Sequence, residues 1–562
     1  MSTSSAPASS ATPKPTAQSS LWAPLGNPTF RSLWLGVLIS AIGTWMQTVG
    51  AQWLLVDQPN AAVLVSLVQA ATTLPVMLLA LPGGVLADSF DRRRLLLAVQ
   101  GYFFVVGVAL ALLTVAGQIT PVLLVVFTVA LGAGVAVQQP AWGATIPEIV
   151  PRSQLRAASS LDLVNVNVSR ALGPALAGLV IAHAGGVSVV FALNAVSVLP
   201  LAVALLTRGR RRGRPAVRRE RFVPAVRAGG RFVWHEPVVR RLLLRAVVFV
   251  APATALWALL PVIATQRLGL GADGYGALFA ALGAGAILGA LVLRRAVERL
   301  SVNGTIATAG VLYAASLAVI VVVPVFPAAL ATLVVTGVAW MAVTSTLQAE
   351  LQLVLPTWVR ARGVALYTMT FMGAQTIAAL VWGVLANRLG VAPAILLAAA
   401  AVLAGVVAGL VWRVPETRHL DPQPAVYWGD PRLAFDPQPD SGPVLVAVHY
   451  TVPAERQTDY LRAMQDLRRS RRRTGASRWE LYRDGERPDH FVELFRVPSW
   501  EEHLRQHAGR LTARDREVEQ AALAFSEPPA TADHLLPPPL TSDVSTQGLS
   551  IQEGQGDGRE QL

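Results

Sequence analysis

Residues 83–94 read Gly83-Gly84-Val85-Leu86-Ala87-Asp88-Ser89-Phe90-Asp91-Arg92-Arg93-Arg94. They lie between two long apolar runs, at about 62–86 and 95–116. The glycines let two helix ends approach closely, an aspartate lies near the last turn of the first run, and three arginines remain in water. The stretch therefore predicts a tight, charged hairpin between two membrane-spanning helices.

The composition also indicates a membrane protein. Hydrophobic residues make up 53% of the 562 positions and charged residues only 14%, whereas a soluble domain carries about a quarter charged residues. A spanning helix needs about 20 apolar residues, and we expect twelve of them. The predicted runs are 33–55, 62–86, 95–116, 121–141, 158–183, 187–206, 242–264, 273–293, 302–322, 328–347, 364–386 and 392–412.

The basic residues predict the orientation of the chain. They follow the even-numbered runs, whereas the loops after odd-numbered runs carry only Arg267 and Arg388. Basic loops stay on the cytoplasmic side, so both termini are expected in the cytoplasm. This distribution, rather than nucleic-acid binding, accounts for the net charge of +13. The run Arg208–Arg221 is expected to meet anionic lipid headgroups, and a short interfacial helix containing Phe222, Val226, Phe232 and Trp234 is expected after it.

The hairpin resembles the loop between helices 2 and 3 of the major facilitator superfamily. Gly84, Asp88, Arg92 and Arg93 match that family's pattern, while Ser89 and Asp91 depart from it. A weak internal repeat with a spacing of about 205 residues agrees with two six-helix halves of the same sense. The expected domains are an N-terminal tail 1–26, a first half 27–207, a basic loop 208–241, a second half 242–413, a linker 414–442, a small domain 443–526 and a C-terminal tail 527–562.

The resemblance implies an all-α secondary transporter that works by alternating access. Asp88, Arg92 and Arg93 would form a cytoplasmic gate with the start of helix 11 near Arg362. The chain has no cysteine, a single lysine (Lys14) and no phosphate-cradling loop, so thiol chemistry is excluded and an ATP-driven pump is disfavoured. We expect no cofactor. The driving force would be a proton gradient, with Asp162 and Glu350 as candidate carriers.

Polar and aromatic side chains inside the runs are candidates for the transport path. The resemblance favours helices 1, 4, 7 and 10 as the lining of the central cavity. Polar residues in a stripe along a membrane helix can equally hold helices together. The tryptophans indicate a large, planar or aromatic substrate. The candidate residues are Gln47, Gln139, Trp142, Arg170, Trp257, Trp340 and Gln348.

Arg170 lies near the middle of the fifth run, where a charge is costly. The residues after it, Gly173, Pro174 and Gly178, resemble the helix-5 antiporter motif of drug exporters, with Ala177 in place of one glycine. The alternative is a proline-kinked packing helix in which backbone carbonyls satisfy Arg170.

Residues 443–525 predict a β-α-β-β-α order. The segment resembles the ferredoxin-like domain of antibiotic-biosynthesis-type monooxygenases, a tail that occurs on facilitators of the enterobactin-exporter-like group. His503 and His507 lie four apart on one helix, but a solvated or half-buried pair is favoured over a metal site, and no metal is expected. A regulatory or dimerising role is favoured over catalysis. Both terminal tails are expected to be disordered.

These features predict a proton-coupled exporter of a drug- or siderophore-like small molecule, located in a bacterial inner membrane. Two alternatives stay open: an importer on the same scaffold, and a membrane-tethered enzyme or sensor that acts through residues 443–525.

Overall fold

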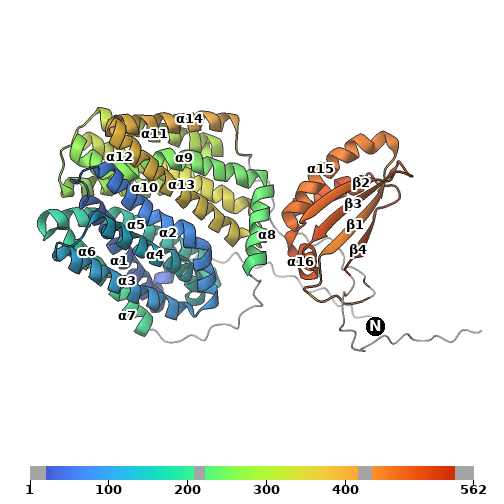
Figure 1. The fold of residues 1–562 in the computed structure, drawn as a ribbon, viewed down its shortest axis with the longest axis horizontal. Coiled ribbons are helices and arrows are strands. Elements are labelled where there is room, and N and C mark those ends of the chain that lie inside the picture. The colour runs from blue at the N-terminus through green and yellow to red at the C-terminus, as the bar shows by residue number, and fades with distance from the viewer. Residues whose placement is uncertain (1–19, 208–221, 416–432, 434, 538–562) are drawn as a thin grey trace, which may run out of the picture. The chain divides into compact units, whose positions relative to one another are not determined.

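The computed structural model describes residues 20–207, 222–415, 433 and 435–537 (Figure 1). These residues form a helical unit and a separate C-terminal unit built around a β-sheet. The expected tails, linker and basic loop lie partly outside the described residues, at 1–19, 208–221, 416–432, 434 and 538–562. The expected lipid contact of Arg208–Arg221 falls among them.

The helical unit contains 12 helices or helix pairs that are long and apolar enough to cross a membrane, which confirms the predicted number. A further helix, α8 (Phe222–His235), lies where the interfacial helix was expected. The spanning elements are α1 (Pro28–Trp53), α2 (Ala61–Ser89), α3 (Arg92–Val115), α4 (Pro121–Ile149), α5 (Leu155–His183), α6 (Gly186–Ser197) with α7 (Leu199–Thr207), α9 (Pro237–Val262), α10 (Ala272–Arg299), α11 (Val302–Val322), α12 (Phe326–Val354), α13 (Arg360–Leu389) and α14 (Val391–Val411).

Proline explains two differences from the predicted runs. The sixth run is broken at Val198 into α6 and α7, because Pro200 has no N–H to donate to the preceding turn. Helix α4 instead continues through Pro140 and Pro147 to Ile149. Prolines are tolerated in membrane helices when neighbouring groups satisfy the freed carbonyls.

Local capping fixes the hairpin that the sequence indicated. Asp91, which departs from the family pattern, is the N-cap of α3, and its carboxylate accepts a hydrogen bond of 2.9 Å from the backbone N–H of Arg94. Asn27 caps α1 in the same way by accepting from the N–H groups of Thr29 and Phe30. Such caps satisfy backbone donors that a helix start leaves unpaired.

The same pairing scheme occurs twice in the helical unit. In the first half α1 packs on α5, α2 on α4, and α3 on α6; in the second half α9 packs on α13, α10 on α12, and α11 on α14. The halves meet through α2 against α13 and α5 against α10. These pairings agree with the predicted internal repeat.

Small residues allow the close approach of the halves. A methyl group on Gly178 of α5 would lie 2.5 Å from the carbonyl oxygen of Ala272 and 2.9 Å from Cα of Gly276 in α10. Across the other contact, the hydroxyls of Thr73 on α2 and Thr376 on α13 are 2.7 Å apart. Both contacts join helices of different halves, as small and hydroxyl residues commonly do in membranes.

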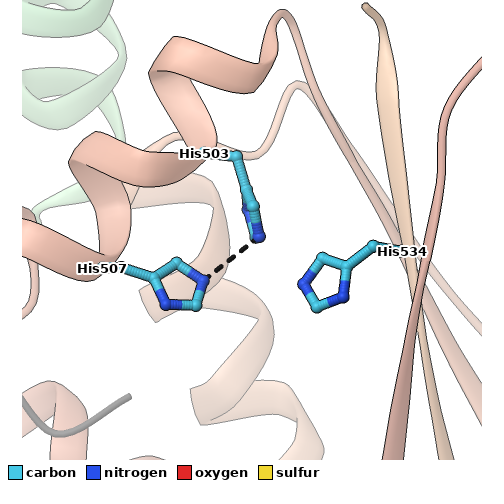
Figure 2. Close-up of side chains that lie close together, drawn as sticks. All are labelled: His503, His507 and His534. Carbon is cyan, nitrogen blue, oxygen red and sulfur yellow. Dashed lines mark hydrogen bonds between the residues drawn. The ribbon is translucent and has the colours of Figure 1, made fainter. Parts of the chain in front are cut away.

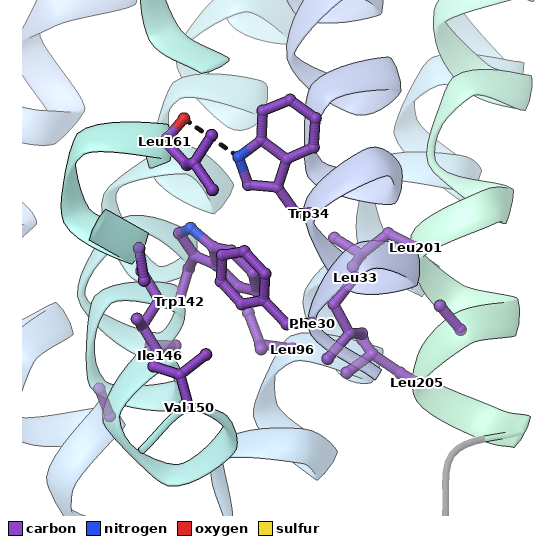
Figure 3. Close-up of a cluster of buried hydrophobic side chains, with 14 residues drawn as sticks. Phe30, Leu33, Trp34, Leu96, Trp142, Ile146, Val150, Leu161, Leu201 and Leu205 are labelled. Carbon is purple, nitrogen blue, oxygen red and sulfur yellow. Dashed lines mark hydrogen bonds between the residues drawn. The ribbon is translucent and has the colours of Figure 1, made fainter. Parts of the chain in front are cut away.

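A packed apolar cluster holds the first half together at the end where α1 begins (Figure 3). Its centre includes Phe30 and Trp34 of α1, Trp142 of α4 and Leu161 of α5. The indole N–H of Trp34 donates to the carbonyl oxygen of Leu161 at 3.1 Å. The cluster therefore fixes the spacing of α1, α4 and α5.

The C-terminal unit is a four-stranded antiparallel sheet in the order β2-β3-β1-β4. Alternate residues of β1 and β3 are buried against the helices, and the others are half-exposed except for Ala447, which is also buried, and Arg496, which is exposed. Its elements are β1 (Val444–Thr451), α15 (Gln457–Thr474), β2 (Arg478–Arg483), β3 (His490–Val497), α16 (Trp500–Arg505), a π-helical turn η5 (Gln506–Arg510), α17 (Ala513–Leu523) and β4 (Thr531–Leu535).

The expected end of this domain at residue 526 is wrong, and the segment 527–535 does not belong to a disordered tail. Strand β4 pairs along β1, with Leu445 opposite Leu535 and His449 opposite Thr531. Pairing with β1 satisfies backbone groups that would otherwise be exposed at a sheet edge.

Candidate functional site

Arg170 lies between two indole rings at the junction of the halves. Its guanidinium carbon is 5.6 Å from the ring centre of Trp45 on α1 and 5.7 Å from that of Trp257 on α9. Among the described residues no carboxylate lies within 4 Å of its nitrogens, and its buried Nε has no hydrogen-bond partner. The charge is thus held by aromatic faces, and at least one N–H is left without an acceptor.

The aromatic surroundings of Arg170 extend across the second half. Trp257 packs on Trp340 of α12 at 5.3 Å and on Phe279 of α10 at 5.5 Å between ring centres. Phe279 in turn contacts Trp45 of the first half at 6.0 Å. Two of the predicted cavity residues, Trp257 and Trp340, are therefore brought together with Arg170 through one cluster of rings.

The glycine-proline segment after Arg170 positions it. A methyl group on Gly173 would lie 2.5 Å from Cβ of Trp45 and 2.9 Å from the carbonyl oxygen of Ile42. At the next residue of α5, the carbonyl oxygen of Pro174 would lie 2.7 Å from a methyl group on Gly276 of α10. The predicted motif therefore lies in a close three-helix contact of α1, α5 and α10, which holds Arg170 beside Trp45.

Trp142 and Asp162 lie together, away from Arg170. Trp142 is buried in the apolar cluster of the first half, and its indole N–H donates to Asp162 Oδ1 at 2.7 Å. Trp142 is thus a packing residue in this conformation, where the sequence predicted a cavity residue. Asp162 is half-buried.

The other candidates are distributed over three helices. Gln47 on α1 is buried, and Glu350 is buried near the end of α12. Gln139 on α4 and Gln348 on α12 are exposed.

The arginines of the expected gate bind within their own half. Arg92 donates to the carbonyl oxygen of Ala144 at 2.9 Å and pairs with Glu148 of α4. Arg93 donates to the carbonyl oxygen of Leu205 in α7 at 2.6 Å. Arg362, in the first turn of α13, packs beside Gly229 of α8. The side chain of Asp88 lies outside the described residues.

Sequence reasoning missed a polar contact between the halves. Tyr275 of α10 donates to Gln52 Oε1 at 2.6 Å, and its ring stacks on Trp53 at 5.9 Å between centres. Gln52 is fully buried, a costly position for an amide without partners. The signal was a glutamine and a tyrosine at the ends of apolar runs, which alone does not reveal that they meet.

The C-terminal unit contains a cluster of three histidines (Figure 2). His503 and His507 are buried, which corrects the expectation of a solvated or half-buried pair, and their Nε2 atoms are 3.1 Å apart. His534 of β4 faces them, and one ring nitrogen from each residue lies within 4.8 Å of the others. Burial, helped by His507 and His534, lowers the pKa of His503 to about 3, so this imidazole is neutral near pH 7.

A buried charge network lies under the same sheet. Arg471 of α15 binds Glu493 of β3 at 3.1 Å and Glu519 of α17 at 2.6 Å. Tyr450 and Trp479 also donate to Glu493, at 2.9 Å and 2.8 Å. Burial opposes the charge of Arg471, but the two carboxylates raise its pKa further than burial lowers it. The network joins two helices to the sheet.

The repeated helix pairing, the twelve spans and the closely packed junction of the halves define a facilitator-type transporter fold. A family model described as transmembrane secretion effector matches residues 19–536. The chain therefore belongs to this family of major facilitator superfamily transporters and is a multi-pass membrane protein. The matched range includes the sheet of the C-terminal unit through β4.

Curated relatives include efflux and export proteins. The chain is 30% identical over 226 residues to the multidrug efflux pump Tap of Mycobacterium tuberculosis (strain ATCC 25618 / H37Rv), covering 38% of this chain and 53% of the relative. It is 27% identical over 267 residues to the enterobactin exporter EntS of Salmonella choleraesuis (strain SC-B67), covering 47% of this chain and 63% of the relative. The match spans about half the length of the Mycobacterium tuberculosis Tap relative, whereas the match to Tap of Mycolicibacterium fortuitum, at 26% identity, covers 68% of this chain and 95% of that relative.

Solved structures support the fold alone. A bacterial homologue of the human lysosomal transporter Spinster, in an inward-facing and unoccupied conformation, superposes with a TM-score of 0.53 at 16% identity. The superposition covers 68% of this chain and 94% of that protein.

Proposed function

We propose that this protein exports a drug- or siderophore-like small molecule across a bacterial inner membrane by proton-coupled alternating access. The family assignment and the similarity to Tap and EntS support export. The observation that carries the substrate class is Arg170, whose guanidinium lies between two indoles, with a buried Nε and without a carboxylate partner among the described residues. Such a site favours an anionic or catechol-like compound with an aromatic part.

The experiment is transport by the purified protein in liposomes with an imposed proton gradient. A panel would pair anionic and neutral aromatic compounds, chosen by screening deletion and overexpression strains against toxic compounds and siderophores. Export that collapses when the proton gradient is removed supports the proposal. Uptake with the same gradient would favour the importer, and transport that needs no gradient would contradict proton coupling.

Proton coupling in this proposal runs through Asp162 or Glu350. Asp162 is half-buried and accepts the indole hydrogen bond of Trp142, while Glu350 is buried. A partly desolvated carboxyl group is suited to gain and lose a proton during transport. Gln47, Gln139 and Gln348 remain candidate contacts for the substrate on helices α1, α4 and α12.

The gate in this proposal is formed by Asp88 with the start of α13 near Arg362, on the cytoplasmic side that also holds both termini. The partial positive charge of a helix start and the arginine would both attract the carboxylate. Arg92 and Arg93 would support the gate indirectly, because they tie the hairpin to α4 and α7.

The C-terminal domain has a ferredoxin-like fold in this proposal and serves as a regulatory or dimerising module. The strand order β2-β3-β1-β4 with antiparallel neighbours supports that fold. The half-exposed face of β1 and β3 would pair with a second copy. Removing residues 436–562 should leave transport in place and abolish dimers in cross-linking, whereas lost transport with intact insertion would favour the domain as the active part.

A further inference from the structure

Three histidines from two separate segments of the C-terminal unit converge on one point. His503 and His507 come from α16 and the π-helical turn η5, and His534 comes from β4 (Figure 2). The ring centres of His503 and His534 are 4.8 Å apart, and those of His503 and His507 are 4.6 Å apart. The rings point toward one another rather than into a shared stack.

The short distance between the Nε2 atoms of His503 and His507 has a chemical consequence. Two imidazole Nε2 atoms 3.1 Å apart cannot both present lone pairs, so either a proton or a cation must lie between them. In a tetrahedral zinc site with bonds of about 2.0–2.1 Å, the ligand nitrogens are about 3.3 Å apart. The pair His503–His507 already has this spacing, and the third nitrogen must move by no more than about 1.5 Å.

The surroundings hold the rings in place. Trp500 packs on His503 at 5.3 Å and meets His534 edge-on at 6.2 Å. His503 is fully buried, and strand pairing puts His534 opposite Val446, on the side of the sheet that faces the helices. The π-helical turn η5, which follows α16 and contains His507, is wider than an α-helical turn, a feature that often marks functional sites.

We propose that His503, His507 and His534 bind one divalent transition-metal ion of the zinc type, which joins α16 and η5 to strand β4. Three neutral imidazoles suit zinc and its neighbours rather than magnesium or calcium. Three protein ligands also leave a fourth position for water or another small ligand. The site lies apart from Arg170 in sequence and does not depend on the transport proposal.

Metal binding to the full-length protein tests this proposal. The protein would carry a streptavidin-binding tag instead of a histidine tag, be stripped with a chelator, and be titrated with Zn²⁺ against a coloured chelator. One equivalent per chain is expected, and His534→Asn should weaken binding at least about tenfold. His449→Asn is the matched control, because His449 lies on the opposite face of β1, where it contacts Asp533.

Hydrogen exchange of the wild-type chain keeps the test independent of any variant's folding. Zn²⁺ should slow exchange in peptides that contain 503–510 and 531–535 and leave the β2–β3 hairpin unchanged. X-ray absorption at the zinc edge should give three imidazole nitrogens at about 2.0–2.1 Å. Absent saturable binding, equal affinity in His534→Asn and His449→Asn, or no protection of β4 would each overturn the proposal.

Discussion

In our proposal, Arg170 determines the preference for negatively charged substrates. Lysine keeps the charge but loses the planar, forked donor geometry that stacks on indoles, so Arg170→Lys should retain partial transport. Arg170→Gln should lose transport of anionic compounds by at least about tenfold and of neutral ones much less, because an attraction of about 1.4 kcal/mol corresponds to that factor. The measurement is transport of one anionic and one neutral substrate per molecule of inserted protein.

A purely structural role for Arg170 has a different signature. Each contact between its guanidinium and an indole contributes about 0.5–2 kcal/mol, so removing both would lower thermal stability and impair every substrate alike. Equal loss for the anionic and the neutral compound would therefore rule out substrate binding by Arg170.

Asp162 gives a second residue-scale prediction. Asp162→Asn keeps the shape of the side chain and an acceptor for the Trp142 indole but cannot exchange a proton. If Asp162 carries the proton, uphill export should fail while exchange of substrate down its own gradient continues. Glu350→Gln is the parallel variant, since Glu350 is the other buried candidate. If export by Asp162→Asn depends on pH as in the wild type, another residue carries the proton.

The buried network around Glu493 predicts an effect on stability rather than transport. Glu493→Gln leaves Arg471 paired with Glu519 but removes the charge to which the side chains of Tyr450, Arg471 and Trp479 donate. Breaking a buried pair from one side costs about 3–5 kcal/mol. Hydrogen exchange in β3 of the full-length chain should rise accordingly. Glu480→Gln is the control, because Glu480 is only partly buried on β2. Similar exchange in both variants would contradict the role of the network.

At the scale of elements, the contact of α5 with α10 depends on two glycines. Gly276→Ala would bring a methyl group 2.7 Å from the carbonyl oxygen of Pro174 and 3.0 Å from Cα of Gly178. Overpacking of this kind costs about 1–3 kcal/mol, so the variant should melt at lower temperature in detergent. Gly101→Ala on α3 is the matched control, since nothing lies within 4 Å of its added methyl group, and it should be neutral or slightly stabilising. Equal melting of the two variants would show that the close contact carries no stability.

The elements themselves were predictable to different degrees. The twelve spans followed from long apolar runs, because the bilayer requires each segment to satisfy its own backbone. The break at Val198 was not predicted, since Pro140 and Pro147 show that a proline inside a run does not by itself end a helix. The C-terminal unit was cut short before β4 because the prolines near residue 528 and beyond residue 536 resemble a linker. Because β4 was not predicted, His534 was not recognised as a neighbour of His503 and His507.

At the scale of the whole molecule, the internal repeat of about 205 residues explains why glycines recur at equivalent positions of the two halves. Gly178 and Gly383 are 383 − 178 = 205 positions apart, and each lies where helices of different halves pack closely. Gly185 and Gly390, also 390 − 185 = 205 positions apart, both adopt positive φ, at 102° and 90°. Local sequence could place Gly178 on α5 and Gly383 on α13, but their partner helices α10 and α2 became known only from the packing.

The contacts between the halves extend from one end of the helical unit to the middle of its helices, where Thr73 meets Thr376. Gln52 lies at the end of α1, Ser66 near the start of α2, and Gly178 near the end of α5. This end is opposite to the Asp88–Arg94 hairpin, because α1 and α5 run away from the hairpin end and α2 runs toward it. Alternating access requires a competing state in which the hairpin end is closed, and the proposed Asp88 gate would stabilise that state.

Asp88→Asn should therefore shift the population toward opening at the hairpin end and reduce transport strongly without preventing insertion. The chain has no native cysteine, so spin labels at Ser153→Cys and Arg360→Cys report the separation of the two halves at this end. The mean distance should increase in Asp88→Asn. Asp91→Asn is the matched control in the same hairpin, because asparagine caps α3 about as well as aspartate and should leave both the distance and transport unchanged. Full transport by Asp88→Asn, or the same distance distribution in both variants, would contradict the gate.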